Sequence, residues 1–295
     1  MSVDYAFAEG APGDREDQGL VQRARAGDRD ALEALIKRHQ GWIYNIAVRM
    51  LFHPQDAEDA TQEILVKVVT RLASFEGRSS VRTWLYRIVV NHVLNMKRGR
   101  VEDPSLSFRA YGEELDNIPD IEPYAPSGSS AEAETLVTEA MLACTTGMLL
   151  CLDREQRLAY ILGAILRVSD IVVADVMDIT RANFRQRLAR ARRDLGNFMN
   201  DKCGLVNPAN PCRCAKKTLG FIQAGHVDPN NLLFHRERIC EVREAVPRAY
   251  ETIKTLDEQR ADIYRGHPFY KPPDLGRRLR QLVESPDLRR ATNLS

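Results

Sequence analysis

The sequence predicts an all-α protein with two helical domains, a flexible acidic linker between them and a small helical extension at the C-terminal end. Two observations predict the domains: apolar residues recur at helical spacing over residues 56–98, and again over residues 152–193. A third predicts the linker, because residues 101–133 between them contain four prolines and show no sustained period. The expected boundaries are a disordered 1–17, a first domain at 18–100, the linker at 101–133, a second domain at 134–200 and the extension at 201–295.

Composition sets limits on the class of protein. The 295 residues allow two or three small domains, and 42 Lys and Arg against 41 Asp and Glu give a net charge of only +1. This balance averages opposite local charges, so only the local pattern is informative. No apolar run approaches a membrane span, and residues 1–17 hold no signal-peptide core. We therefore expect a cytoplasmic protein with no membrane partner.

An acidic helix is expected over residues 56–72. Its buried stripe is formed by apolar residues at spacings of three and four: Ala57, Ala60, Ile64, Leu65, Val68, Val69 and Leu72. Acidic residues crowd its first turn, where carboxylates suit the positive end of the helix dipole, and this chemistry alone accounts for Asp56 as well as a binding role does. Gln62 and Glu63 continue the polar face further than the dipole requires.

A basic helix follows, with a core side running from Val81 to Met96. Its polar sector gathers Trp84, Arg87, Asn91, Asn95 and Arg98 within about a quarter turn. This composition is expected of a surface that contacts phosphates and stacks on bases. The alternative is a solvated basic face on which Trp84 is a partly buried anchor.

The second domain shows the pattern of a helix-turn-helix. Residues 168–180 supply a first helix and its turn, and Phe184 and Leu188 pack the second helix over them. Residues 181–193 contain six arginines and no acid, which favours a recognition helix over a merely solvated one. The N-terminal side chains of such a helix reach bases and the later ones contact phosphates. The candidate residues are Arg181, Asn183, Arg185, Arg187, Arg190, Arg192 and Arg193.

The order and spacing of these motifs resemble the extracytoplasmic-function (ECF) sigma factors, bacterial subunits that direct RNA polymerase to promoters. Residues 18–100 resemble region two, through the acidic start 56–63, Phe75-x-Gly and 82–88 followed by Asn91; residues 134–200 resemble region four. The resemblance implies core RNA polymerase (β′ clamp helices and β flap) and promoter DNA as partners. It implies a clamp-helix contact by Asp56, Asp59, Gln62 and Glu63. It further implies −10 recognition by Phe75, Arg82, Trp84, Arg87, Asn91, Asn95 and Arg98, with Phe75 at a pocket for a flipped base, and −35 recognition by the second domain.

Two departures from region four stand out. Asp178 occupies the usual glycine position of the turn, and Asp tolerates a left-handed backbone. Ile171 and Val172 replace the usual acidic pair, which predicts an extra apolar patch that could bind an anti-sigma protein or the chain's own extension.

The linker carries nine acidic residues and one basic residue, Arg109, between residues 102 and 134. It is either a disordered spacer or, as the resemblance implies, a chain that threads the RNA exit channel.

The extension holds the remaining signal. Cys203, Cys212 and Cys214 lie within twelve residues, near Lys202, Arg213, Lys216 and Lys217, which favour thiolates. A soft metal such as zinc, a redox switch and an inert cluster all remain open, and no cofactor is required. Cys144, Cys151 and Cys240 are expected to be isolated thiols. Further helices are expected around residues 219–222, 232–234, 242–264 and 275–283.

We expect a sigma factor without catalysis of its own, regulated by this extension through metal or redox state. The alternatives are a free-standing helix-turn-helix regulator with a metal-responsive C-terminus, which leaves the first domain without a role, and a metal-dependent nucleic-acid enzyme. The sequence has no deaminase-type H-x-E with P-C-x-x-C and no Gly-rich phosphate loop, which disfavours the enzyme.

Overall fold

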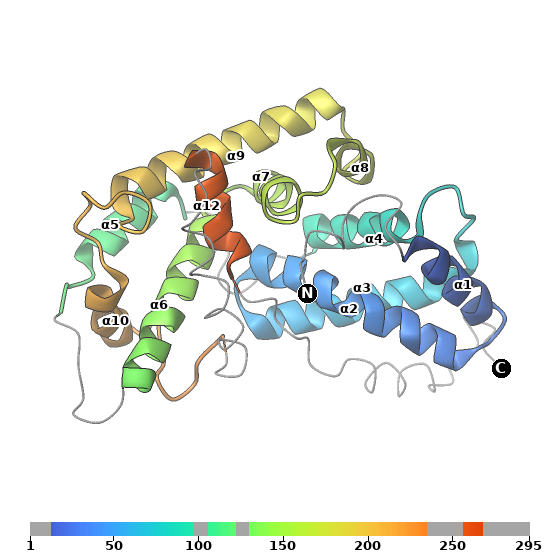
Figure 1. Ribbon diagram of the computed structural model, residues 1–295, viewed down its shortest axis with the longest axis horizontal. Helices are drawn as coiled ribbons and strands as arrows, with labels where there is room; N and C mark the ends of the chain where they lie inside the picture. The colour runs from blue at the N-terminus through green and yellow to red at the C-terminus, as the bar shows by residue number, and fades with distance from the viewer. Residues whose placement is uncertain (1–12, 97–105, 122–129, 235–255, 268–295) are drawn as a thin grey trace.

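The computed structural model describes residues 13–96, 106–121, 130–234 and 256–267 (Figure 1). All regular structure in these ranges is helical, as the sequence predicts. None of the described helices is long and apolar enough to cross a membrane. The expected helix at 275–283, Cys240 and Arg98 lie outside the described residues.

The first domain is a four-helix bundle of α1 (Asp14–Arg25), α2 (Arg29–Leu51), α3 (Pro54–Arg71) and α4 (Val81–Asn95). The helix starts follow capping rules: the side chain of Asp28 accepts from the amide of Ala31, Pro54 is at the first turn of α3, and Ser80 caps α4. The seven apolar residues predicted for the stripe of α3 are all buried. The prediction for this helix is confirmed.

The expected disorder of residues 1–17 is wrong at its C-terminal end, because α1 begins at Asp14. Asp17 is buried, 2.6 Å from Arg38 Nε and 3.2 Å from His39 Nε2. Burial alone would raise the pKa of Asp17, but the hydrogen bond and charge of His39, with the charge of Arg38, outweigh it and lower that pKa. This buried pairing holds α1 on α2. The sequence did not indicate a partner for Asp17, because Arg38 and His39 lie more than twenty positions further along the chain.

The second domain contains α6 (Ser130–Leu150), α7 (Arg154–Tyr160), a π-helical turn η3 (Ile161–Ile165), α8 (Asp170–Val176) and α9 (Arg181–Lys202). Helices α8 and α9 form the predicted helix-turn-helix. The turn places Asp178 at φ 52°, in the left-handed region, which confirms the expectation for this position. Phe184 and Leu188 of α9 are buried, also as predicted.

The linker is not wholly flexible, which corrects the sequence-based expectation. A helix, α5 (Phe108–Asn117), begins after the Ser107 cap and packs against the end of α9. Its apolar side chains Phe108 and Leu115 point into packed contacts, and Ile118 just beyond it is buried. The acidic composition concealed this helix, because its apolar positions are few and closely followed by proline.

The extension contributes α10 (Cys214–Gln223), which includes the expected segment 219–222, and α12 (Leu256–Arg265), which covers the end of the expected segment 242–264. Residues 232–234 are not helical, so that prediction is wrong. Figure 1 shows α9 running along one side of the molecule, with α5 near its C-terminal end, α12 beside its middle and α8 at its N-terminal end.

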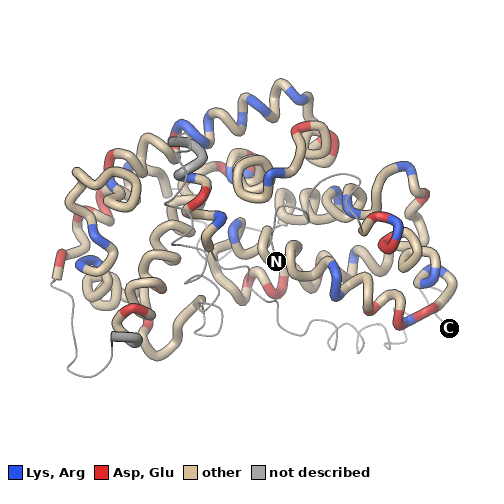
Figure 2. Tube along the Cα trace, in the orientation of Figure 1, with Lys and Arg blue, Asp and Glu red and all other residues tan. Residues whose placement is uncertain are grey.

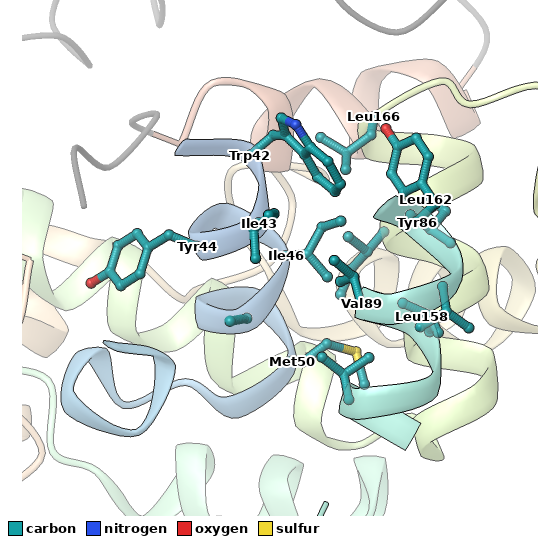
Figure 3. Close-up of a cluster of buried hydrophobic side chains, with 14 of the residues drawn as sticks. Trp42, Ile43, Tyr44, Ile46, Met50, Tyr86, Val89, Leu158, Leu162 and Leu166 are labelled. Atoms are coloured by element: carbon teal, nitrogen blue, oxygen red, sulfur yellow. The ribbon is translucent and has the colours of Figure 1, made fainter. Parts of the chain in front are cut away.

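The two domains are not separated but share one apolar core. Figure 3 shows Ile46 and Met50 of α2 and Val89 of α4 meeting Leu158 of α7 and Leu162 of η3. The guanidinium of Arg157, only 3% exposed, donates to the carbonyl oxygens of Met50 in the first domain and of Leu149, Leu150 and Leu152 in the second. The chain is therefore in a closed arrangement, which the sequence did not predict.

Candidate nucleic-acid interface

An open acidic face lies on α3. Asp59 and Glu63 are exposed, and Asp56 and Gln62 on the same side of the helix are half-buried. Behind them His92 of α4 is buried, with its Nδ1 2.7 Å from Lys67 Nζ and its Nε2 3.9 Å from Glu63. Burial, together with the charge of Lys67, lowers the pKa of His92 despite the opposite effect of Glu63. The four predicted residues thus form one accessible, negatively charged patch.

The loop before α4 places Phe75 in the core of the first domain. Phe75 is only 7% exposed, and its ring lies 5.4 Å from the half-buried ring of Trp84 at an interplanar angle of 57°. Arg25 of α1 donates to the carbonyl of Phe75 at 3.2 Å. The structure therefore places Phe75 against Trp84, another residue of the predicted −10 set, and packs its ring into the core; its role at a pocket for a flipped base stays a prediction.

The polar sector of α4 has an unpredicted partner. Asn91 and Asn95 are exposed and Arg82 is half-buried. Arg87, however, turns to the second domain, where its Nη2 lies 2.7 Å from both carboxylate oxygens of Asp175 on α8. One of the predicted base-reading groups is thus engaged by the helix-turn-helix.

The basic face of α9 is the most exposed cationic surface among the candidates, and Figure 2 shows Lys and Arg spaced along this helix. Its first turns are tied to α8: Asp170 accepts from Arg181 at 3.1 Å and from Arg185 Nε at 2.8 Å. Hydrogen bonds from Arg185 first, and then from Arg181, lower the pKa of Asp170. Of the remaining predicted residues, Arg190 and Arg193 are exposed, whereas Asn183, Arg187 and Arg192 are half-buried.

The predicted apolar patch on α8 is half wrong. Ile171 is 55% exposed, but Val172 is 5% exposed and belongs to the core. The two residues are adjacent in a helix, so they point about 100° apart and cannot both face solvent when α8 packs on α9. A single exposed isoleucine remains.

The thiols gather more closely than the sequence indicates. Cys203 follows the last residue of α9, and Cys212 and Cys214 flank the start of α10. Burial of Cys144 on α6, with smaller effects from these three thiols, raises its pKa. Cys144 is therefore not isolated, contrary to expectation. It was missed because it lies about sixty residues before the others, and only the packing of α6 on α10 brings it close.

Thiolates are not favoured at these cysteines, which corrects a second expectation. Burial, with the nearby Cys203 and Cys212, raises the pKa of Cys214 to about 12. Burial also raises the pKa values of Cys203 and Cys212, and the charge of Lys217 opposes this only in part at Cys212. In the described part of the chain, no three His, Cys, Asp or Glu side chains are arranged to hold a metal ion. The metal assignment to Cys203, Cys212 and Cys214 stays a prediction.

Comparisons with known proteins bear on these surfaces. The family model of sigma-70 region 2 matches residues 35–101, which include α3 and α4. The RNA polymerase sigma-H factor of Pseudomonas aeruginosa is 39% identical over 87 residues, spanning 29% of this chain and 45% of that relative. The ECF RNA polymerase sigma-E factors of Haemophilus influenzae and Escherichia coli K12 are 28% and 29% identical, each over 61% of this chain and over 94% and 93% of the relatives.

Among solved structures, the sigma factor RpoE in complex with the anti-sigma factor NepR from Bartonella quintana is similar, with a TM-score of 0.37 and 20% identity. The similarity covers 55% of this chain and 91% of that one.

Proposed function

We infer that this chain, which belongs to the ECF sigma factors of the sigma-70 family, binds core RNA polymerase, recognises the −35 and −10 promoter elements and helps to open the DNA. A sigma-70 region 2 model matches residues 35–101, and the sigma-E relatives align over 61% of this chain and at least 93% of their own length. The observation that carries the residue roles is the joint presence of an exposed acidic face on α3 and two polar, basic helices, α4 and α9. One surface suits a protein and two suit DNA.

The sites follow the same division. Asp56, Asp59, Gln62 and Glu63 contact the clamp helices of the polymerase, α4 reads the −10 strand, and α9 enters the major groove at −35. The chain supplies recognition and strand separation, while the polymerase performs the chemistry, so no catalytic residue is assigned. It acts where the polymerase acts, in the cytoplasm.

The test is assembly with purified core RNA polymerase, followed by transcription from a library of genomic fragments. We expect a stable complex on gel filtration and transcripts that start from a restricted set of fragments sharing two sequence elements. A chain that binds DNA fragments but never associates with core polymerase would instead be a free-standing helix-turn-helix regulator.

A second proposal concerns the extension, which we assign a regulatory role through the thiols of Cys203, Cys212 and Cys214. It is supported by the place of these thiols at the junction of α9 and α10; because no three described side chains are arranged to hold a metal ion, binding would require the thiols to move together. Binding of a soft divalent cation would displace the thiol protons that burial now retains. An anti-sigma protein is a further proposed partner, for which exposed Ile171 on α8 offers an apolar contact.

A further inference from the structure

The closed arrangement has a geometric consequence for promoter binding. Elements centred at −35 and −10 lie about 25 base pairs apart, which is about 85 Å along B-form DNA. In the structure Arg87 of α4 touches Asp175 of α8 directly. Since α4 and α9 cannot reach both elements from contact, the two domains must separate, and the linker sets how far.

The linker is held along part of its length, and this shortens its reach. The ring centroids of Phe108 on α5 and Phe198 on α9 lie 5.3 Å apart, and Asp116 Oδ2 lies 2.6 Å from Lys202 Nζ. With α5 held there, residues 97–107 join Met96 to Phe108, and this stretch spans about 40 Å at full extension. The length of α9 back to Arg181 adds at most about 30 Å. With about 14 Å more for α4 from Arg87 to Met96, the total only just approaches about 85 Å with the chain fully taut, whereas a linker released to Ser130 spans about 115 Å by itself.

Helix α10 of the extension holds the end of α5 through a buried lysine. Lys217 is 8% exposed, and its ammonium donates to the carbonyl oxygens of Leu115 (3.1 Å) and Ile118 and lies 3.2 Å from Asp120 Oδ1. Carbonyls at a helix C-terminus carry partial negative charge, so a cation placed there stabilises the helix end. If only some of these acceptors were lost while the ammonium stayed buried, its charge would be left without compensation. A partial opening of the contact is therefore costly in free energy.

The backbone of the same helix completes the contact. The amide of Ile121 donates to the carbonyl of Lys216 at 2.9 Å. Gly220 faces the linker so closely that a Cβ atom there would lie 2.6 Å from the carbonyl oxygen of Pro119. At the far end of α10, His226 lies 3.2 Å from Glu114 of α5. One face of α10 therefore follows the linker from Glu114 to Ile121.

We propose that α10 is an intramolecular lock whose partner is the linker segment 114–121, and that release of this segment lets the two DNA-binding domains separate to promoter spacing. The proposal rests on the proposed function for its consequence in transcription, but the lock itself is a property of the free chain. The acidic linker and the basic helix match in charge, and neither α10 nor the segment belongs to the acidic face of α3 or to the basic faces of α4 and α9.

Two substitutions in the full-length chain test the lock. Lys217→Met removes the ammonium at similar length, and Gly220→Ala inserts one methyl against Pro119. The controls are Lys37→Met, the same change at an exposed lysine of α2, and Gly19→Ala on α1, where nothing lies within 4 Å of the added Cβ. We expect amide hydrogen exchange over residues 108–121 to rise roughly tenfold or more in both test variants and in neither control. Unchanged exchange in a folded Gly220→Ala chain overturns the lock, even if Lys217→Met fails to fold.

Transcription separates the lock from the proposed function. With core polymerase, both test variants should bind promoter DNA several-fold more tightly than the parent chain. Faster exchange with unchanged promoter binding overturns the regulatory role of the lock. Faster exchange in a chain that never binds core polymerase leaves the lock standing and overturns the sigma-factor function on which its role depends.

Discussion

Arg87 Nη2 on α4 lies 2.7 Å from both carboxylate oxygens of Asp175 on α8, so a residue predicted to read the −10 element is paired with an acid of the helix-turn-helix 88 positions later. Both side chains are about 45% exposed, at 44% and 45%. An ion pair this accessible contributes about 1 kcal/mol or less to stability. The main effect of the ion pair is therefore to occupy the guanidinium of Arg87, which keeps it away from nucleic acid while the domains are closed.

Asp175→Asn should free Arg87 with little effect on the fold. We expect the free energy of unfolding to change by less than about 1 kcal/mol, and the affinity for labelled single-stranded DNA to rise by up to about fivefold. Fluorescence anisotropy measures the second quantity. Asp194→Asn is the matched control, because Asp194 pairs with its neighbour Arg193 on α9 and not with α4. An equal gain in both variants would mean that only net charge matters.

The apolar seam between the domains depends on Arg157 more than on this surface pair. Arg157→Met keeps the length of the side chain but leaves carbonyls of both domains, including that of Met50, without their donor. We expect a loss of about 3 kcal/mol or more in the free energy of unfolding, measured by urea titration. The comparison is Arg190→Met on the exposed face of α9, which should stay within about 0.5 kcal/mol of the parent. Similar losses in the two variants would contradict a specific role at the seam.

The sequence predicted the parts better than their assembly. Periodicity and capping located α3, α4, α8 and α9, and the left-handed Asp178 was foreseen, because each of these depends on neighbours within a few residues. The closed seam depends on pairs such as Leu158 and Ile46, which lie more than a hundred positions apart. Such pairs leave no local pattern, since a residue buried at an interface and one buried within its own domain look alike in a sequence.

Polar partners were the least predictable. Lys217 was assigned to the surroundings of the thiols because it lies near Cys214 in the sequence, yet its ammonium caps the linker helix. Phe75 was predicted to lie at a pocket for a flipped base, and the closed form packs its ring against Trp84. In each case the contact that the structure shows depends on residues far away in the sequence.

The acidic face of α3 should act only in polymerase binding. The double charge reversal Asp59→Lys with Glu63→Lys changes two exposed side chains, so thermal stability should fall by no more than a few degrees. We expect at least tenfold weaker binding to core polymerase, measured by competition against the parent chain, and unchanged binding to free double-stranded DNA beyond a general gain from added positive charge. Asp228→Lys, on the exposed surface of the extension, controls for charge. Full polymerase binding by the double variant would exclude this face as the docking site.

A buried histidine should make the closed fold sensitive to acid. His267 follows α12 and is 5% exposed, and its Nε2 lies 2.8 Å from Thr145 Oγ1 on α6. Burial, together with the charge of Arg49 on α2, lowers the pKa of His267 to about 3. The unfolded chain takes up this proton near pH 6.5, but the folded chain does not. Stability is therefore present above pH 6.5 and is lost as the pH falls from 6.5 towards 3.

The loss attributable to His267 should approach about 1.4 kcal/mol per pH unit within that window. His267→Asn replaces the ring with a side chain that does not titrate, so the variant should show a shallower decline in the free energy of unfolding between pH 6.5 and 4. Asp17 also has a lowered pKa and contributes its own decline at lower pH in both chains. Urea titrations at four pH values compare the slopes. Parallel slopes would show that His267 is not the titrating group.

The four buried thiols should react slowly with alkylating reagents and should make the stability of the fold sensitive to alkaline pH. Burial raises the pKa values of Cys203, Cys212 and Cys144, and raises that of Cys214 to about 12, so at neutral pH all four should react with iodoacetamide more slowly than a free cysteine. Because these pKa values are raised in the folded state, the contribution of the four thiols to stability is complete below the unfolded pKa near 9 and is lost as the pH rises towards 12.

Zinc should change both properties together: it should protect the thiols further and release protons that a pH indicator detects. Cys144→Ser should weaken zinc binding as strongly as Cys212→Ser does, whereas Cys151→Ser should not. If Cys144→Ser binds zinc like the parent, Cys144 is not a ligand; if the parent releases no proton on adding zinc, the thiols do not form a metal site.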